Sequence, residues 1–288
     1  MLSTVIPVAG LGTRSLPASK VIPKEMLPVF DRPIIQYIVE ESIQSGASNI
    51  IFVTSKGKTA IEDHFDISFE LEHLLERTKK TDLYKGIHAL SREISIQSVR
   101  QKEQLGLGHA VLMAKNLIHT GPFGVLLGDD MIDSNPAGLK QLTNTYDLVK
   151  KNQAADIGVV MLSEVPDSEV SKYGICEIKS GTDFQITRCV EKPQPHETKS
   201  RFAILGRYLL PLDTFEILES QSRGALGEIQ LTDALNALAK QGRLFGCVLK
   251  GQRFDAGDRL GFLKANIHYY LKSPMAQDVK NFLKEILK

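Results

Sequence analysis

The sequence of 288 residues predicts an α/β fold, namely a three-layer α/β/α sandwich around a central mixed, mainly parallel sheet. Two observations predict this class. In the first half, short apolar segments alternate with segments of helical length, and strands joined by such helices form parallel sheets covered on both faces. In the second half, the apolar segments follow one another over shorter connections, which favours some antiparallel pairing.

The first half is expected to place helices between its strands. β-Branched and aliphatic residues, which suit a buried sheet, predict strands at Thr4–Val8, Ile50–Thr54, Ile94–Val99 and Phe123–Leu127. The intervening segments are expected to be helices at Pro33–Ser45, Ala60–Leu75, His109–Leu117 and Asn135–Lys151. The first of these helices carries Ile34, Ile38 and Val39 on one face, and Gly46 is a typical helix stop.

The second half is expected to add further strands and three helices. The strands are predicted at Ile157–Leu162, Gly174–Ile178, Ile186–Val190 and Ala203–Leu209. The helices are predicted at Glu228–Lys240 and Leu260–Leu271, with a last one that starts at Pro274. This last helix could pack on its own domain or on a neighbouring subunit. No repeat, linker or low-complexity segment divides the chain, so residues 1–288 are expected to form a single domain.

The composition argues against several classes of protein. The net charge is +1, from 35 basic and 34 acidic residues, so no broad positive field is expected and nucleic acid is not an expected partner. Cys176, Cys189 and Cys247 lie far apart and are odd in number, which is typical of a reducing cytoplasm. The chain shows neither a signal-peptide pattern nor an apolar run of membrane-spanning length. We therefore expect a soluble cytoplasmic protein with no membrane partner.

A glycine-rich turn directly follows the first predicted strand. Gly10 and Gly12 allow a tight bend that presents backbone N–H groups, and Arg14 and Lys24 add cations nearby. Such a loop can wrap a polyphosphate. A dinucleotide-binding fingerprint would need a third glycine at the position of Ser15, so that class of site is not expected. The alternative is an ordinary turn between a strand and a helix.

A second candidate cluster follows the strand that ends at Val99. The Gln101 amide can pair with the edge of a base, and Gly106 allows a flat ring to lie against the backbone. The alternative is a surface loop that ends in glycines. His109 is expected to be an ordinary polar residue at a helix start and is not placed in the site.

Carboxylates follow the predicted strand that ends at Leu127. Asp129 and Asp130 at this strand end could hold Mg²⁺ against phosphates, with Asp255 as a partner carboxylate. The alternative is a turn at each place, with Asp258 as the cap of the helix that follows.

A fourth cluster lies at the end of the strand that contains Val190. Glu191 could accept hydrogen bonds from sugar hydroxyls and Lys192 could meet a phosphate, while Gly174 permits a close backbone approach. The alternative is an exposed, charged strand end. Gly227–Asp233 is expected to be a mostly structural helix start. No arrangement suggests a covalent nucleophile, so the inventory favours phosphoryl chemistry.

Segments spread over nearly the whole chain resemble the sugar-1-phosphate nucleotidylyltransferases, and most closely the members that transfer a uridylyl group. These segments are Ala9–Arg14, Pro23–Pro28, Gln36–Glu41, Ile61–Asp66, Val99–Lys102, Gly106–Ala110, Val190–Pro193, Gly227–Asp233 and Phe254–Asp258. The resemblance implies a Rossmann-like sandwich of the nucleotide-diphospho-sugar transferase type. It further implies Mg²⁺-dependent transfer of UMP from UTP to glucose 1-phosphate, giving UDP-glucose and pyrophosphate, by a homo-oligomer such as a dimer or tetramer.

The resemblance also implies a role for particular residues. Nucleotide contacts are implied for Ala9, Gly10, Leu11, Gly12, Glu25, Gln101 and Gly106, and catalytic roles for Arg14 and Lys24. Sugar-phosphate contacts are implied for Gly174, Glu191 and Lys192, and Mg²⁺ ligation for Asp129 and Asp255.

Two alternatives remain at this point. One is a related transferase that uses thymidine nucleotides, since Gln101 and Gly106 could also accept thymine. The other is a non-catalytic regulatory paralogue, although the intact Thr13-Arg14 argues against it. Arg201-Phe202 replaces a frequent Asn-Leu of the family near the expected sugar site, which leaves the preferred sugar open.

Overall fold

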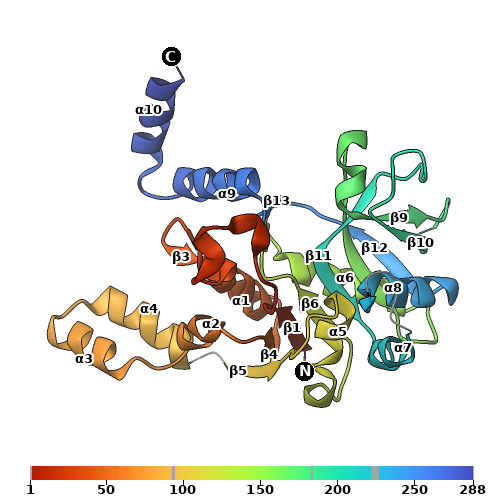
Figure 1. Cartoon of the computed structure of the whole chain (residues 1–288), viewed down its shortest axis with the longest axis horizontal. Helices are drawn as coiled ribbons and strands as arrows, with labels where there is room; N and C mark the ends of the chain where they lie inside the picture. Colours follow the sequence, from red (N-terminus) through yellow and green to blue (C-terminus); the bar gives the residue numbers. More distant parts are fainter. Residues whose placement is uncertain (1, 93–94, 183, 222–226, 288) are drawn as a thin grey trace.

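The computed structural model describes residues 2–92, 95–182, 184–221 and 227–287, and they fold around one mixed sheet (Figure 1). Neighbouring strands follow the order β10 (Ile186–Glu191), β9 (Gly174–Ile178), β11 (Phe202–Leu210), β6 (Phe123–Leu126), β1 (Leu2–Pro7), β4 (Ala47–Thr54) and β5 (Ile96–Arg100). In addition, β8 (Gly158–Glu164) pairs with β11 and with β12 (Leu244–Val248).

The two halves of the sheet differ in direction. β1 lies between β4 and β6 and runs parallel to both, and β5 is parallel to β4. β11 instead runs antiparallel to β6, β8 and β9, while β12 is parallel to β8. The predicted mixed sheet is confirmed. Because β1, β5 and β6 are parallel, their carboxyl ends meet at one edge of the sheet.

Helices cover both faces of the sheet, as predicted. α1 (Ile34–Gln44) and α6 (Gly138–Lys150) lie on one face, and α5 (Leu107–Leu112), α7 (Thr214–Ser220) and α8 (Leu231–Lys240) lie on the other. Side chains alternate between the faces along each strand. In β1, Ile6 therefore packs into the core beneath α1 and α6, and Val5 packs into the core beneath α5, α7 and α8.

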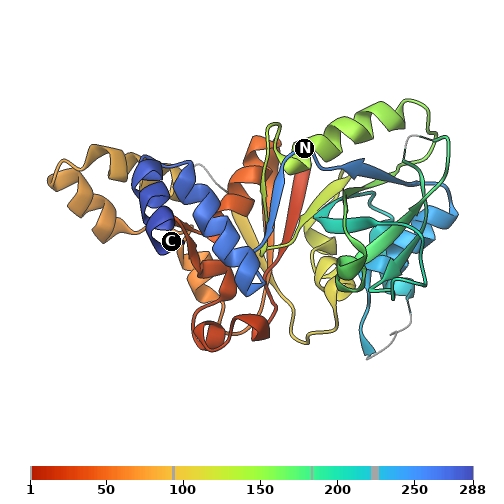
Figure 2. The same ribbon diagram turned by 90° about the horizontal axis from the view of Figure 1, so that it is seen from above.

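Two small two-stranded sheets and the last helices complete the fold. β7 (Asp130–Asp133) pairs antiparallel with β13 (Gln252–Asp255), and β2 (Pro28–Val29) pairs with β3 (Arg32–Pro33). α9 (Arg259–Leu271) leads into α10 (Ala276–Ile286), which holds no buried residue. Both figures show α10 and the pair α3 and α4 on the same side of the molecule, away from β9 and β10 (Figures 1 and 2). Among the described residues, no helix is both long and apolar enough to cross a bilayer.

The prediction of one helix over Ala60–Leu75 is wrong. The chain forms α2 (Thr59–Asp63) and α3 (Phe69–Arg77), followed by α4 (Thr81–Arg92), which the sequence analysis did not predict. The helix breaks because Phe65 turns into the core, with its ring 5.6 Å from that of Phe52. α3 and α4 then pack on each other outside the sheet. Ile94, the predicted start of one strand, lies outside the described residues.

Candidate active site

A cleft of two adjoining cavities lies beyond the carboxyl ends of β1 and β6. The cavities measure about 300 and about 710 Å³, a size that suits small ligands. We call the smaller one the glycine-loop cavity and the larger one the Glu191 cavity. They share Leu107, Leu127, Asp129 and Glu228, so they form one continuous cleft.

The candidate residues from the sequence divide between these two cavities. The glycine-loop cavity is lined by Ala9, Gly10, Lys24, Glu25, Gln101 and Gly106. The Glu191 cavity is lined by Arg14, Gly174, Glu191, Lys192 and Asp255. Asp129 belongs to both. Of the predicted site residues, only Leu11 and Gly12 line neither cavity. Residues expected to contact the nucleotide and residues expected to contact the sugar phosphate thus lie in different cavities, whereas Arg14, expected at the triphosphate, lines the Glu191 cavity.

Gly12 shapes the glycine loop rather than lining it. Its φ is +68°, a left-handed conformation that favours glycine, and an added Cβ would lie 3.2 Å from Ser19 Cβ. The Ser19 hydroxyl donates to the Gly12 carbonyl at 2.6 Å. Leu11 beside it is exposed, as is the Arg14 side chain at 68 %. The loop therefore has a fixed bend and an exposed cation.

Lys24 lies where the two cavities meet. Its Nζ donates to Asp129 Oδ2 at 2.5 Å. Burial disfavours the charge on Lys24, but the carboxylates of Asp129 and Glu25 outweigh it and raise the pKa of the amine above its ordinary value. Burial likewise opposes the charge on Asp129, and Lys24 overcomes it and lowers the pKa of that carboxyl. Both groups are therefore charged at neutral pH.

Glu25 is held from behind by a buried lysine. Lys58 Nζ donates to Glu25 Oε2 at 2.8 Å, and the two residues are 7 % and 1 % exposed. Burial raises the pKa of Glu25, and the Lys58 and Lys24 charges partly oppose that rise. Glu25 still lines the glycine-loop cavity, so it can meet a ligand while Lys58 fixes its carboxylate.

Asp129 and Asp255 converge on Gly257. A Cβ added at Gly257 would lie 2.5 Å from Asp129 Oδ2 and 3.1 Å from Asp255 Oδ1, so glycine leaves room for both carboxylates. Burial raises the pKa of Asp255; Arg253 opposes this rise, and the nearby carboxylates of Asp129 and Asp130 add to it. Gathered carboxylates of this kind fit a hard dication such as Mg²⁺, which takes one or two carboxylates and completes its shell with phosphates and water. Among the described residues, no three His, Cys, Asp or Glu side chains form a metal-binding group.

The Asp130 side chain holds neighbouring strands together. Its Oδ2 accepts from the Gly206 N–H at 2.8 Å, and its Oδ1 accepts from Arg253 Nε at 2.7 Å. Arg253 Nη1 also donates to the Tyr173 hydroxyl at 3.0 Å. Asp130 therefore ties the β7–β13 strand pair to β11, although both Asp129 and Asp130 line the cleft.

A buried ion pair supports this β7–β13 strand pair from the other side. Arg207 of β11 is fully buried and donates from Nε and Nη2 to the two Glu41 oxygens at 2.9 and 2.8 Å. Its Nη2 also donates to the Asp130 carbonyl at 2.6 Å. The sequence analysis missed this pair, and the only available signal was an arginine inside an otherwise apolar strand.

The loop from Gln101 to Gly106 closes against the segment before α8. Gly106 has a φ of +94°, and an added Cβ would lie 2.8 Å from the Ile229 carbonyl. The Ile229 N–H donates to the Leu105 carbonyl at 2.7 Å, and the Gly108 N–H donates to the Ile229 carbonyl at 2.9 Å. The expected helix start at Glu228 is therefore wrong, because residues 228–230 serve this contact and α8 begins at Leu231.

The physical reason for Gly106 also differs from the expected one. The side on which a Cβ would lie is filled by Glu228 and Ile229, so the glycine is needed for close packing of the protein chain. Gly106 still lines the glycine-loop cavity. Gln104 Nε2 donates to the Ala9 carbonyl at 3.0 Å and so ties this loop to the glycine loop.

Glu191 and Gly174 face each other across neighbouring strands. They are register partners in β10 and β9, and an added Cβ at Gly174 would lie 3.3 Å from Glu191 Oε2. The Thr232 hydroxyl donates to Glu191 Oε2 at 2.8 Å. Lys192 has a φ of +44°, which is uncommon for a residue with a side chain.

Several lining residues were absent from the predicted site. They are Gln104 and Glu228 in the glycine-loop cavity, and Tyr173, Thr232 and Arg253 in the Glu191 cavity. The segment that contains Glu228 and Thr232 resembled a family motif, but it was expected to be structural. Arg201 and Phe202, the departure from the family, line neither cavity. Arg201 Nε instead donates to Asp167, and its Nη1 donates to the Thr198 carbonyl at 3.0 Å.

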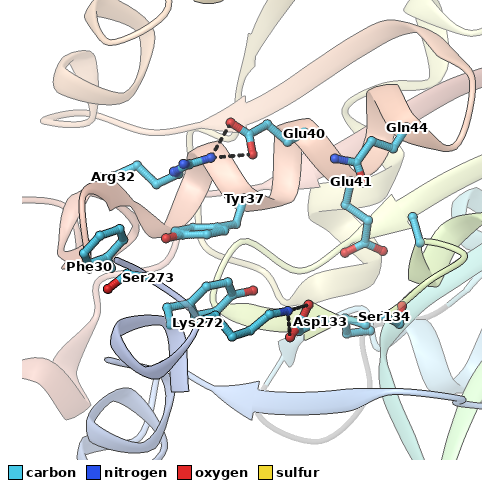
Figure 3. A pocket seen from close by; sticks show the side chains of 13 residues that line it. Phe30, Arg32, Tyr37, Glu40, Glu41, Gln44, Asp133, Ser134, Lys272 and Ser273 are labelled. Carbon is cyan, nitrogen blue, oxygen red and sulfur yellow. Dashed lines mark hydrogen bonds and ion pairs between the residues drawn. The ribbon is translucent and has the colours of Figure 1, made fainter. Parts of the chain in front are cut away.

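A separate pocket of about 300 Å³ lies between α1, β7 and α9 (Figure 3). We call it the Tyr37 pocket. Arg32 donates to both Glu40 oxygens at 3.1 and 3.0 Å, and Lys272 donates to both Asp133 oxygens at 2.9 and 2.6 Å. None of the predicted site residues lines this pocket.

Comparison with known proteins identifies the class of this protein. The profile of the Nucleotidyl transferase family matches residues 3–271, and the chain belongs to that family. A UTP–glucose-1-phosphate uridylyltransferase of Staphylococcus epidermidis is 45 % identical to it over 285 residues, which cover 98 % of this chain and 97 % of the relative.

Solved structures of similar proteins carry relevant ligands. A UTP-bound UGPase from Acinetobacter baumannii superposes with a TM-score of 0.88 at 39 % identity and covers 99 % of each chain. A UDP-glucose pyrophosphorylase complexed with UDP-glucose superposes with a TM-score of 0.84 at 39 % identity, covering 95 % of this chain and all of that one.

Proposed function

We propose that the cleft transfers UMP from UTP to glucose 1-phosphate and releases pyrophosphate, giving UDP-glucose. The observation that carries the proposal is the division of the site residues between two cavities that share Asp129. The relatives support it, because they are uridylyltransferases named for glucose 1-phosphate or are bound to UTP or UDP-glucose.

UTP occupies the glycine-loop cavity. The backbone of Ala9 and Gly10 lies beside the phosphates, and Gly12, with Leu11, sets the bend of that loop. The Gln101 amide reads the uracil edge, with Gly106 and Glu25 beside it in the same cavity.

Glucose 1-phosphate occupies the Glu191 cavity. Glu191, oriented by the Thr232 hydroxyl, accepts hydrogen bonds from sugar hydroxyls. Gly174 lets the sugar approach the backbone, and Lys192, which is 64 % exposed, meets the phosphate. Arg201 and Phe202 lie outside the cavity, so this departure from the family does not alter the proposed sugar contacts.

The reaction needs positioning and charge neutralisation more than covalent help. A phosphate oxygen of the sugar phosphate forms a bond to the α-phosphorus of UTP, and the bond from that phosphorus to the pyrophosphate oxygen breaks. Lys24 lies at the boundary of the two cavities, where this transfer occurs, and its ammonium stabilises the growing negative charge. Arg14 holds the departing phosphates from the exposed end of the loop.

Asp129 and Asp255 are the proposed ligands of Mg²⁺. When bound there, the ion would neutralise phosphate charge and the mutual repulsion of the two carboxylates. Lys24 fixes the Asp129 carboxylate through its 2.5 Å contact, so that oxygen is oriented before a ligand arrives. Asp129 is preferred to Asp130 for this role because each Asp130 oxygen accepts a hydrogen bond that holds the fold together.

We also expect a homo-oligomer. Phe282 and Ile286 of α10 are 59 % and 60 % exposed, and α10 packs on α9. An exposed apolar helix face of this kind suits a contact with a second copy of the chain.

A panel of nucleotides and sugar phosphates tests the proposed function. The purified protein with Mg²⁺ is supplied with UTP, dTTP or CTP and with different sugar 1-phosphates, and pyrophosphate release is measured. We expect the highest kcat/KM for UTP with glucose 1-phosphate. Turnover with dTTP alone would instead identify a thymidylyltransferase, and no release with any pair would favour a non-catalytic paralogue.

A further inference from the structure

The orientation of the Gln101 amide is fixed by two neighbours. Its Nε2 lies 3.2 Å from the Gly106 carbonyl oxygen and 2.9 Å from His109 Nδ1. A carbonyl oxygen only accepts hydrogen bonds, so the amide must turn its NH₂ group toward Gly106. The opposite orientation would place two acceptor oxygens against each other.

This orientation also fixes the tautomer of His109. Because Gln101 Nε2 is a donor, His109 Nδ1 must be the acceptor, and the ring proton resides on Nε2. The Gln101 NH₂ group is thus engaged by two acceptors. Within the described part of the chain, its Oε1 receives no hydrogen bond, while the side chain lines the glycine-loop cavity. The Gln101 side chain therefore presents an acceptor, not a donor, to a base.

We propose that His109 is a positioning residue that makes the cleft selective for a base whose ring nitrogen N3 carries a hydrogen. This inference rests on the proposed function, in which the base of a nucleoside triphosphate meets Gln101. Uracil presents N3–H, which can donate to Gln101 Oε1, whereas cytosine presents a lone pair at N3 and meets the same oxygen with repulsion. His109 does not line the cavity and acts through the amide.

Removal of the Nδ1 acceptor would release the amide. Only the longer contact to the Gly106 carbonyl, at 3.2 Å, would then hold the NH₂ group. The amide could rotate and offer its NH₂ group to N3 of cytosine. Discrimination between the two pyrimidines would fall, although neither the phosphate contacts nor the sugar site changes.

Two variants of His109 separate orientation from structure. His109→Leu removes the acceptor, and His109→Asn places an amide oxygen near the original position of Nδ1. Binding of UTP and of CTP to the wild type and to each variant is measured by calorimetry without sugar phosphate. Steady-state kinetics with glucose 1-phosphate follows, and thermal melting reports on folding.

We expect the ratio of CTP to UTP dissociation constants to fall about tenfold or more in His109→Leu, the size of effect that one base-specific pairing supplies. The kinetic change should fall on KM for UTP more than on kcat, and His109→Asn should restore most of the ratio. An unchanged ratio in His109→Leu would overturn the inference, as would a wild type that binds CTP as tightly as UTP, or a folded His109→Asn that behaves like His109→Leu. Failure of the proposed function would show separately, as UTP binding without pyrophosphate release.

Discussion

The Tyr37 pocket and the Glu191 cavity of the cleft differ in how closely their cations are paired with carboxylates. In the Tyr37 pocket, the cations are held by the pocket's own acids. Arg32 makes two contacts of 3.1 and 3.0 Å with Glu40, and Lys272 makes two of 2.9 and 2.6 Å with Asp133. These short, two-fold contacts leave little unsatisfied charge for a ligand (Figure 3).

In the Glu191 cavity of the cleft, two outer cations lie farther from their acidic neighbours. Arg14 lies 3.9 Å from Asp255, and Lys192 lies 3.9 Å from Glu191, and both cations are mostly exposed. These distances are too long for hydrogen bonds. The two sites therefore differ in the pairing of their outer cations, whereas Lys24, deeper in the cleft, is paired with Asp129 at 2.5 Å.

The largest difference between the two sites is expected when a lysine of each is replaced. Lys24→Ala removes the cation between the two cavities, and we expect kcat for UDP-glucose formation to fall by about 10²- to 10³-fold, the usual loss for a group that stabilises charge in the transition state. Lys272→Ala makes the same change in the Tyr37 pocket and should leave kcat nearly as in the wild type. Equal losses in the two variants would contradict the assignment of the chemistry to the cleft.

Replacement of one carboxylate in each site tests which of them binds Mg²⁺. Asp129→Asn removes half of the proposed metal site, so the Mg²⁺ concentration for half-maximal activity should rise by about tenfold or more, because the amide is a poorer ligand than the carboxylate. Asp133→Asn in the Tyr37 pocket serves as the control and should keep the wild-type titration. A wild-type titration for Asp129→Asn would mean that the ion has other ligands.

The sugar side of the cleft should respond through binding. Glu191→Gln weakens the acceptor that faces the sugar, and we expect KM for glucose 1-phosphate to rise by about tenfold, in line with the loss of a hydrogen bond to a charged group. KM for UTP should change little. Thr232→Val, which removes the hydroxyl that orients Glu191, should act in the same direction but less strongly. A rise confined to KM for UTP would mean that the assignment of the two substrates to the two cavities must be reversed.

The smallest effect is expected in the Tyr37 pocket. Glu40→Gln breaks the pair with Arg32, whose two side chains are 35 % and 30 % exposed. A partly exposed pair contributes only about 0–1 kcal/mol, so we expect a small change in the melting temperature and an unchanged kcat. A large loss of activity would show that this pocket is coupled to the cleft, for which the neighbouring Glu41 and Arg207 provide a physical connection.

Local sequence signals predicted the sheet, and together with the family resemblance they predicted a set of site residues that all line the cleft except Leu11 and Gly12. The β1 strand and the glycine loop, for example, are adjacent in the chain, and their geometry follows from a few residues. Contacts between distant segments gave no such signal. The pairing of Ile229 with Leu105 and the buried Arg207–Glu41 pair depend on how the chain closes in space. Nothing in the sequence placed His109 in the site, because its contact with Gln101 depends on how the loop between the two residues folds.

Determination of a crystal structure with UTP and Mg²⁺ tests most directly which cavity carries the chemistry. We expect triphosphate density beside Gly10 and Lys24, with the base against Gln101 and a metal ion between Asp129 and Asp255. Density for the nucleotide in the Tyr37 pocket, or a triphosphate remote from Lys24 in the cleft, would contradict this expectation.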